Sequence, residues 1–99
     1  MEHFTSRIPF SLLELSANEL KSIAHPVRLA ILDLLCQNEK LTVKEIQEAL
    51  NIEQTVASYH LIQMKNKQLV KSKKKANMMF YSIDNAKVPR FLDILLHDK

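Results

Sequence analysis

The 99-residue chain contains no glycine. Glycine is the residue that adopts positive φ at the least steric cost, so each tight turn in this chain must be made by another residue. Asparagine tolerates the left-handed region better than most other residues, and five asparagines fall where a periodic segment ends. They are Asn38, Asn51, Asn66, Asn77 and Asn85. As end or turn residues, they divide the chain into short segments.

The first two thirds of the chain have the spacing and capping signals of four helices. Ser11 and Ser16 are each followed by glutamate three residues later, the spacing of a capping box, and either is expected to start the first helix. Pro26 fits the first position of a second helix. Thr42 begins a third capping box, and a fourth helix is expected over 54–67. The side chains predicted to point inward are Leu29, Ile31, Leu32 and Leu35, then Ile46, Ala49 and Leu50, then Ala57, Leu61 and Met64.

The hydrophobic period changes after residue 68. Residues 69–73 and 78–83 are predicted to be two strands, with 74–77 as the connecting turn. Met78, Met79 and Phe80 are interpreted as strand core rather than as a ligand site. Asp84 is expected to cap a last helix, which tolerates Pro89 only in its first turn. The fold class is therefore mainly α with a small β-hairpin, in the order α-α-α-α-β-β-α, and residues 1–99 are expected to form one domain.

The charge is unevenly distributed. Residues 54–83 contain no acidic residue and six lysines, whereas the rest of the chain has eight basic against eleven acidic residues. A basic segment on a mildly acidic body favours a polyanionic partner, although a solvated lysine cluster is the alternative.

A short helix, a three-residue turn, a second helix and a basic hairpin form the winged helix-turn-helix plan, in which the second helix enters the DNA major groove. Asn51 supplies the bend and Ile52 an apolar plug. Residues 42–83 are thus expected to meet double-stranded DNA. The predicted DNA-binding residues are Gln54, Thr55, Ser58, Tyr59, His60, Gln63 and Lys65 on the fourth helix and Lys71, Lys73, Lys74 and Lys75 on the hairpin. His60 either touches a phosphate or packs against the hairpin, and Arg28 is an ion-pair partner or a phosphate contact.

Four stretches carry a resemblance to a known family: residues 24–32 (AHPVRLAIL), 54–61 (QTVASYHL), 69–70 (LV) and 80–83 (FYSI). Together they resemble the ArsR/SmtB-type bacterial repressors over about residues 12–96. The resemblance implies a helix-turn-helix over about 42–67, a wing over about 69–83, and a homodimer built from helices at about 12–24 and 86–97. It also implies a palindromic operator and repression relieved by a signal. Gln68 replaces the glycine usual before the wing, and Glu53 replaces a common serine cap.

No sensor motif is found. Metal-sensing members of this family carry a Cys-x-Cys or Asp-x-His pair, and this sequence has neither. Neither a metal nor another cofactor is therefore expected. The alternative is a metal site in a dimer, which could bring His3 or His97 near Asp98. Cys36, the only cysteine, is expected to be a buried small hydrophobe, with a reactive redox thiol as the alternative. The inducer stays unidentified.

The predicted function is a cytoplasmic, homodimeric, sequence-specific DNA-binding transcriptional regulator, and repression is expected rather than activation. The alternative is a winged-helix module that binds proteins instead of DNA. An enzyme is not expected because no phosphate-binding loop or nucleophile motif is present. No apolar run reaches the roughly 18 residues that a membrane span requires, and the first residues lack the layout of a signal peptide.

Overall fold

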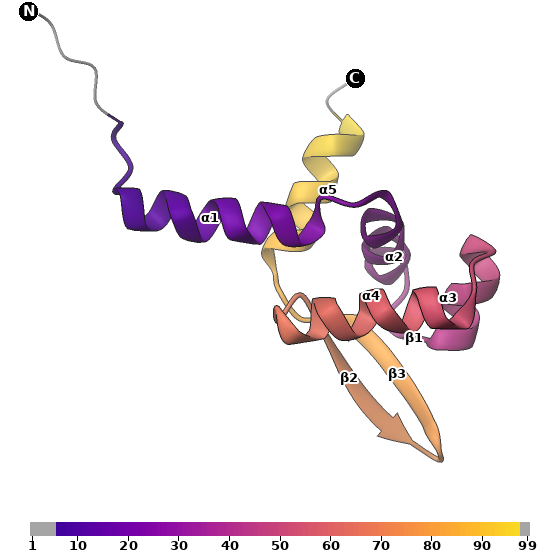
Figure 1. The fold of residues 1–99 in the computed structure, drawn as a ribbon. Coiled ribbons are helices and arrows are strands. Elements are labelled where there is room, and N and C mark those ends of the chain that lie inside the picture. Colours follow the sequence, from indigo (N-terminus) through magenta and orange to yellow (C-terminus); the bar gives the residue numbers. More distant parts are fainter. Residues whose placement is uncertain (1–5, 98–99) are drawn as a thin grey trace, which may run out of the picture.

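The computed structural model describes residues 6–97. Its elements in chain order are α1 (Phe10–Ile23), α2 (Pro26–Gln37), β1 (Leu41–Thr42), α3 (Val43–Leu50), α4 (Gln54–Asn66), β2 (Val70–Lys75), β3 (Met78–Ile83) and α5 (Lys87–His97) (Figure 1). The predicted fold class is confirmed, with the two-residue strand β1 as an addition to the predicted order. None of the helices in this described part combines the length and apolar character needed to cross a bilayer.

Two predicted helix starts are wrong. α1 begins at Phe10, where the Pro9 carbonyl accepts from the amides of Leu12 and Leu13, so Ser11 and Ser16 lie inside the helix and cap nothing. A capping-box spacing is a local signal, and here the fixed φ of Pro9 starts the helix earlier.

At α5 the cap is Asn85 rather than Asp84. The Asn85 side-chain oxygen accepts from the Lys87 amide at 2.9 Å, and its backbone carbonyl accepts from the Val88 amide at 3.0 Å. The last helix therefore begins slightly later than an Asp84 cap would place it.

The helix-turn-helix has the capping predicted for it. The Thr42 hydroxyl accepts from the Glu45 amide at 3.2 Å, and the Glu45 carboxylate accepts from the Thr42 amide at 2.9 Å. Asn51 ends α3 in the left-handed region, with φ of 53°. This residue turns the chain so that α4 can begin at Gln54, after a turn of three residues, 51–53.

The strands form a three-stranded antiparallel sheet in the order β1-β3-β2. β2 runs two residues further than predicted, to Lys75, because the turn is only two residues long. Ala76 and Asn77 both have positive φ, at 49° and 66°, as a type I′ hairpin turn requires. The register pairs Val70 with Ile83 and Lys75 with Met78. The hairpin projects from the helical body (Figure 1).

α4 ends in a Schellman motif. The Leu69 amide donates to the Met64 carbonyl at 2.9 Å, and the Gln68 amide donates to the Lys65 carbonyl at 3.0 Å. The residue between helix and strand must then adopt positive φ, and Gln68 has φ of 61°. This is the position at which the resemblance expects glycine.

The core lies between α2, α3, α4 and the sheet. Its fully buried side chains are Ile31, Leu32, Ile46, Leu61, Met64 and Val70. Ala49, predicted to point inward, is exposed. The inner stripe of α3 consists of Val43, Ile46, Gln47 and Leu50, which have the i, i+3, i+4, i+7 spacing of one helix face and leave Ala49 at its edge.

Candidate nucleic-acid interface

α4 is anchored by its inner face and presents its outer face to solvent. Ala57, Leu61 and Met64 have no exposed surface, so the helix cannot rotate without uncovering them. Of the polar residues predicted to face DNA, Gln54, Thr55, Tyr59 and Lys65 are exposed, and Ser58 and Gln63 are half-buried.

Two apolar residues on the outer face of α4 are missing from the predicted set. Ile62 is 51% exposed and Val56 is 38% exposed. Seven residues separate Ile62 from Thr55, which is close to two helical turns, so both lie on one face with Tyr59 between them. The helical period places Ile62 on the outer face with Thr55, but an apolar side chain is usually expected to be buried. The period was therefore the signal that could have identified Ile62.

His60 does not lie on the outer face. It is only 7% exposed, and its Nδ1 accepts from Arg28 Nε at 3.1 Å. The His25 ring lies 4.6 Å away, centroid to centroid. His60 therefore neither presents its ring to a phosphate nor packs chiefly against the hairpin. It packs against the start of α2, because it occupies the same face of α4 as Ala57 and Leu61.

Arg28 connects three helices at this point. Besides its bond to His60 in α4, its Nη1 donates to the Ser22 carbonyl near the end of α1 at 2.8 Å. Burial, with His25 and Arg28 adding positive charge, lowers the pKa of His60. A lowered pKa favours the neutral ring, which is the form in which Nδ1 can accept from Arg28.

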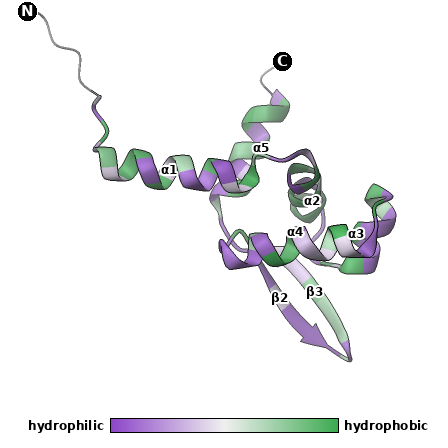
Figure 2. Cartoon of the chain, in the orientation of Figure 1, coloured by the Kyte–Doolittle hydropathy of each residue, from purple (hydrophilic) through white to green (hydrophobic). Residues whose placement is uncertain are grey.

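The hairpin, here called the wing, carries its lysines on both faces. Because side chains alternate along a strand, Lys71, Lys73 and Lys75 share one face of β2, and Lys74 lies on the other. Figure 2 shows the contrast between hydrophilic β2 and the paler, partly hydrophobic β3. All four lysines are exposed.

A fifth lysine joins this cluster from a distant part of the sequence. Lys40 precedes β1, and its Nζ lies 4.9 Å from the centroid of the Phe80 ring, a cation–π distance. Lys40, Lys73, Lys74, Lys75 and Phe80 line one groove. Only the pairing of β1 with β3 brings Lys40 here, so no local sequence signal could reveal it.

The methionines at the end of the wing are not core residues. Met78 is 51% exposed and Met79 is 40% exposed, and Phe80 is half-buried. They immediately follow the two-residue turn at 76–77, where the hairpin extends beyond the helices that cover its base.

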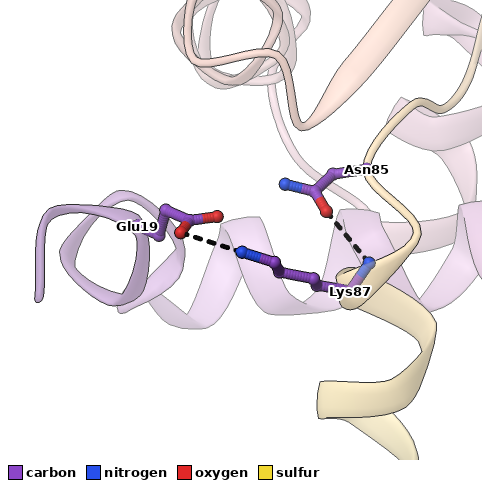
Figure 3. Close-up of polar contacts among 3 residues, drawn as sticks. All are labelled: Glu19, Asn85 and Lys87. Atoms are coloured by element: carbon purple, nitrogen blue, oxygen red, sulfur yellow. Dashed lines mark hydrogen bonds and ion pairs between the residues drawn. The ribbon is translucent and has the colours of Figure 1, made fainter. Parts of the chain in front are cut away.

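A second surface is formed by α1 and α5. Its exposed apolar residues are Phe10, Leu12, Leu13, Leu15, Leu20, Ile94, Leu95 and Leu96. A groove of about 250 Å³ between the two helices is lined chiefly by apolar side chains, among them Leu20, Ile23, Val88 and Phe91. At its rim Lys87 Nζ lies 3.3 Å from Glu19 Oε1, beside the Asn85 cap (Figure 3). This exposed ion pair adds little stability.

Cys36 is exposed, and its prediction as a buried hydrophobe is wrong. The buried side of α2 is formed by Ile31, Leu32 and Leu35, and Cys36 lies about 100° around the helix from Leu35. Although the residue is exposed, partial desolvation of its thiol, together with Asp33 and Asp93, raises the pKa. A raised pKa lowers the fraction of reactive thiolate.

Within residues 6–97, no three His, Cys, Asp or Glu side chains come together as a metal site would require. The His97 ring is hydrogen-bonded to the Asp93 carbonyl at 2.8 Å. His3 and Asp98, the other residues considered for a site in a dimer, lie outside the described residues.

Comparisons with known proteins agree with this architecture. Residues 23–71 match a family model described as a helix-turn-helix domain. The chain is 36% identical to the transcriptional repressor PagR of Bacillus anthracis, covering 90% of this chain and 89% of the relative. The crystal structure of that repressor superposes with a TM-score of 0.78 at 34% identity over 88% of this chain and 99% of the other.

Two further relatives extend the comparison. The transcriptional activator HlyU of Vibrio cholerae is 32% identical over 88% of this chain and 85% of its own length. The homodimeric winged helix-turn-helix DNA-binding domain of Mb0332 from Mycobacterium bovis superposes with a TM-score of 0.77, at 29% identity over 96% of this chain and 87% of that one.

An anchored α4 that presents polar side chains together with Val56 and Ile62 on its outer face, followed by a lysine-rich wing, defines a winged helix-turn-helix DNA-binding protein. The chain belongs to the ArsR family of these transcriptional regulators. It is a DNA-binding regulator of transcription, and its relatives are regulators rather than enzymes.

Proposed function

We propose that the protein is a cytoplasmic, homodimeric repressor that binds a palindromic operator. The observation that carries this proposal is the separation of two surfaces, the apolar one on α1 and α5 and the basic one on α4 and the wing. Pairing two chains through the first surface leaves both copies of the second free for DNA. A two-fold dimer then reads two half-sites about 34 Å apart, one turn of DNA.

The residues divide into two roles. Base edges are read by Gln54, Thr55, Ser58, Tyr59 and Gln63, since amides and hydroxyls can bond to bases exposed in the major groove. Phosphates are bound by Lys65, Lys71, Lys73, Lys74 and Lys75, with Lys40 added to this set. His60 positions α4 from behind through its bond with Arg28.

The dimer surface is supported by the amount of apolar side chain left in water. Leu15 is 62% exposed and Ile94 is 64% exposed, on helices joined by a short apolar groove. A monomer of this size buries only about 60–65% of its unfolded surface, so covering these residues would add needed stability.

DNA binding is tested by selecting sequences from a random pool and measuring affinity for the enriched sequence against salt. Each phosphate contact contributes about 0.9 to the slope of log affinity against log salt. Replacing Lys73, Lys74 and Lys75 by alanine should therefore flatten the slope by up to about 5 in a dimer. Affinity for unrelated DNA should fall in parallel.

The matched control removes the same charge elsewhere. Arg7, Lys21 and Arg90 are exposed and lie outside α4 and the wing. In a variant that light scattering shows to be dimeric, their replacement by alanine should leave the slope within about 1 of the original. Equal effects of the two triple variants would refute the phosphate role of the wing.

The dimer is tested by light scattering. Leu15→Glu combined with Leu95→Glu places charges on the α1–α5 surface and should give monomers. Met79→Glu, a similar change at the exposed end of the wing, should remain dimeric. A monomeric unsubstituted protein that still binds a palindrome tightly would refute the proposal.

A further inference from the structure

α4 carries a row of three exposed side chains, of which Val56 and Ile62 belong neither to the core nor to the polar reading set, while Tyr59 between them adds an apolar ring. Val56 is 38% exposed, Tyr59 is 57% exposed and Ile62 is 51% exposed. They are spaced three residues apart, so they form an oblique row across the outer face. The inner face of the same helix is already filled by Ala57, Leu61 and Met64. The row therefore has no partner within the described chain.

The charge around the row indicates what covers it. No acidic residue occurs from Gln54 to Ile83, and Lys65 lies in the last turn of the same helix. A protein partner would need a matching apolar and acidic surface, whereas DNA supplies phosphates for the lysines and an apolar group in the major groove. That group is the 5-methyl of thymine, which apolar side chains contact directly.

We propose that Ile62, with Tyr59 and Val56 beside it, contacts thymine methyl groups and selects A·T pairs at fixed positions in each half-site. The inference rests on the proposed DNA-binding function and adds a specificity-determining residue to it. Ile62 lies seven residues beyond Thr55, which is about 10 Å along the helix. This corresponds to about three base-pair steps of 3.4 Å. Within one half-site, Thr55 can therefore make a polar base contact while Ile62 makes an apolar one about three base pairs away.

The experiment uses the DNA sequence enriched from a random pool, with each thymine replaced in turn by deoxyuridine. This change removes only the methyl group and leaves every hydrogen-bonding atom in place. Binding of the unsubstituted protein should weaken about fourfold at one thymine or more per half-site, the value for burying one methyl-sized group. With Ile62→Ala, the same replacement should cost less than about twofold, because the contact is already lost.

Two further variants separate this effect from a change in fold. Ile62→Val retains an apolar contact and should retain most of the deoxyuridine effect. Ile8→Ala makes the same truncation at an isoleucine that is 46% exposed and lies before α1, and should leave the effect at its full size. Circular dichroism should show equal helix content in all variants.

The outcomes are distinguishable. Strong binding that is insensitive to every deoxyuridine replacement would overturn the thymine inference and leave the DNA-binding function intact. An undiminished deoxyuridine effect in Ile62→Ala would likewise overturn it, leaving the apolar row to a protein partner. Failure to enrich or bind any DNA would overturn the proposed function and this inference together.

Discussion

Gln68 occupies a backbone position that favours glycine. Its φ is 61°, and its amide and that of Leu69 close the Schellman motif at the end of α4. The left-handed region costs an ordinary L-residue about 1–2 kcal/mol, and glycine loses about 0.5–1 kcal/mol more backbone entropy on folding. Gln68→Gly should therefore raise the free energy of unfolding by about 0.5–1 kcal/mol.

Urea-induced unfolding followed by circular dichroism measures this change, at one fixed protein concentration because dimerisation would otherwise alter apparent stability. Gln68→Ala should bring no gain, since alanine retains the steric cost. Lys65→Gly places glycine inside α4 and should lose about 1 kcal/mol. If Gln68→Gly lost stability as Lys65→Gly does, the left-handed conformation assigned to Gln68 would be refuted.

Three other substitutions or conditions test neighbouring features. Glu53 precedes α4 without a side-chain cap bond, so Glu53→Ser should stabilise the protein by about 0.5–1 kcal/mol. Denaturant unfolding measures this change, with Glu53→Gln as the control. An equal gain in the control would exclude capping as the cause. Thr42→Ala removes the capping box of α3 and should lower the free energy of unfolding by about 1 kcal/mol. A decrease of less than about 0.2 kcal/mol would show that the cap does not stabilise the protein. The pKa of His60 is lowered in the folded protein, so near the ordinary histidine pKa of about 6.5 the unfolded chain binds more protons than the folded chain. The free energy of unfolding should therefore fall as the pH drops below about 6.5. A His60→Gln variant whose stability has the same pH dependence would refute this.

The helices and hairpin could be predicted because each leaves a periodic or capping signal within a few residues. Thr42 with Glu45 and Pro26 at the start of α2 are local motifs, and their structures follow from local sequence. β1 leaves no such signal, since two residues have no detectable period. Lys40 reaches Phe80 only through the pairing of β1 with β3, so its place in the basic cluster depends on tertiary structure.

The remaining errors arise from equating apolar character with burial. Cys36 and Met78 lie on apolar stretches, yet both are exposed. Conversely, His60 is polar and buried, because Arg28 satisfies its ring nitrogen. Residue type alone could not decide these positions, since burial depends on which face of the helix or which end of the hairpin is covered.

The two ends of α4 have a common property: neither has the residue that would stabilise it best. Glu53 makes no side-chain cap bond at one end, and Gln68 has positive φ just beyond the other. α4 is therefore held mainly by its buried inner face and by the Arg28–His60 bond. About 20 Å of helix separates the two ends, a distance at which stability effects normally add. The Glu53→Ser, Gln68→Gly double variant should thus gain the sum of the single gains within about 0.5 kcal/mol, measured by the same urea unfolding. A larger discrepancy would mean that the ends are coupled through α4, and that the inner-face contacts do not by themselves fix the helix.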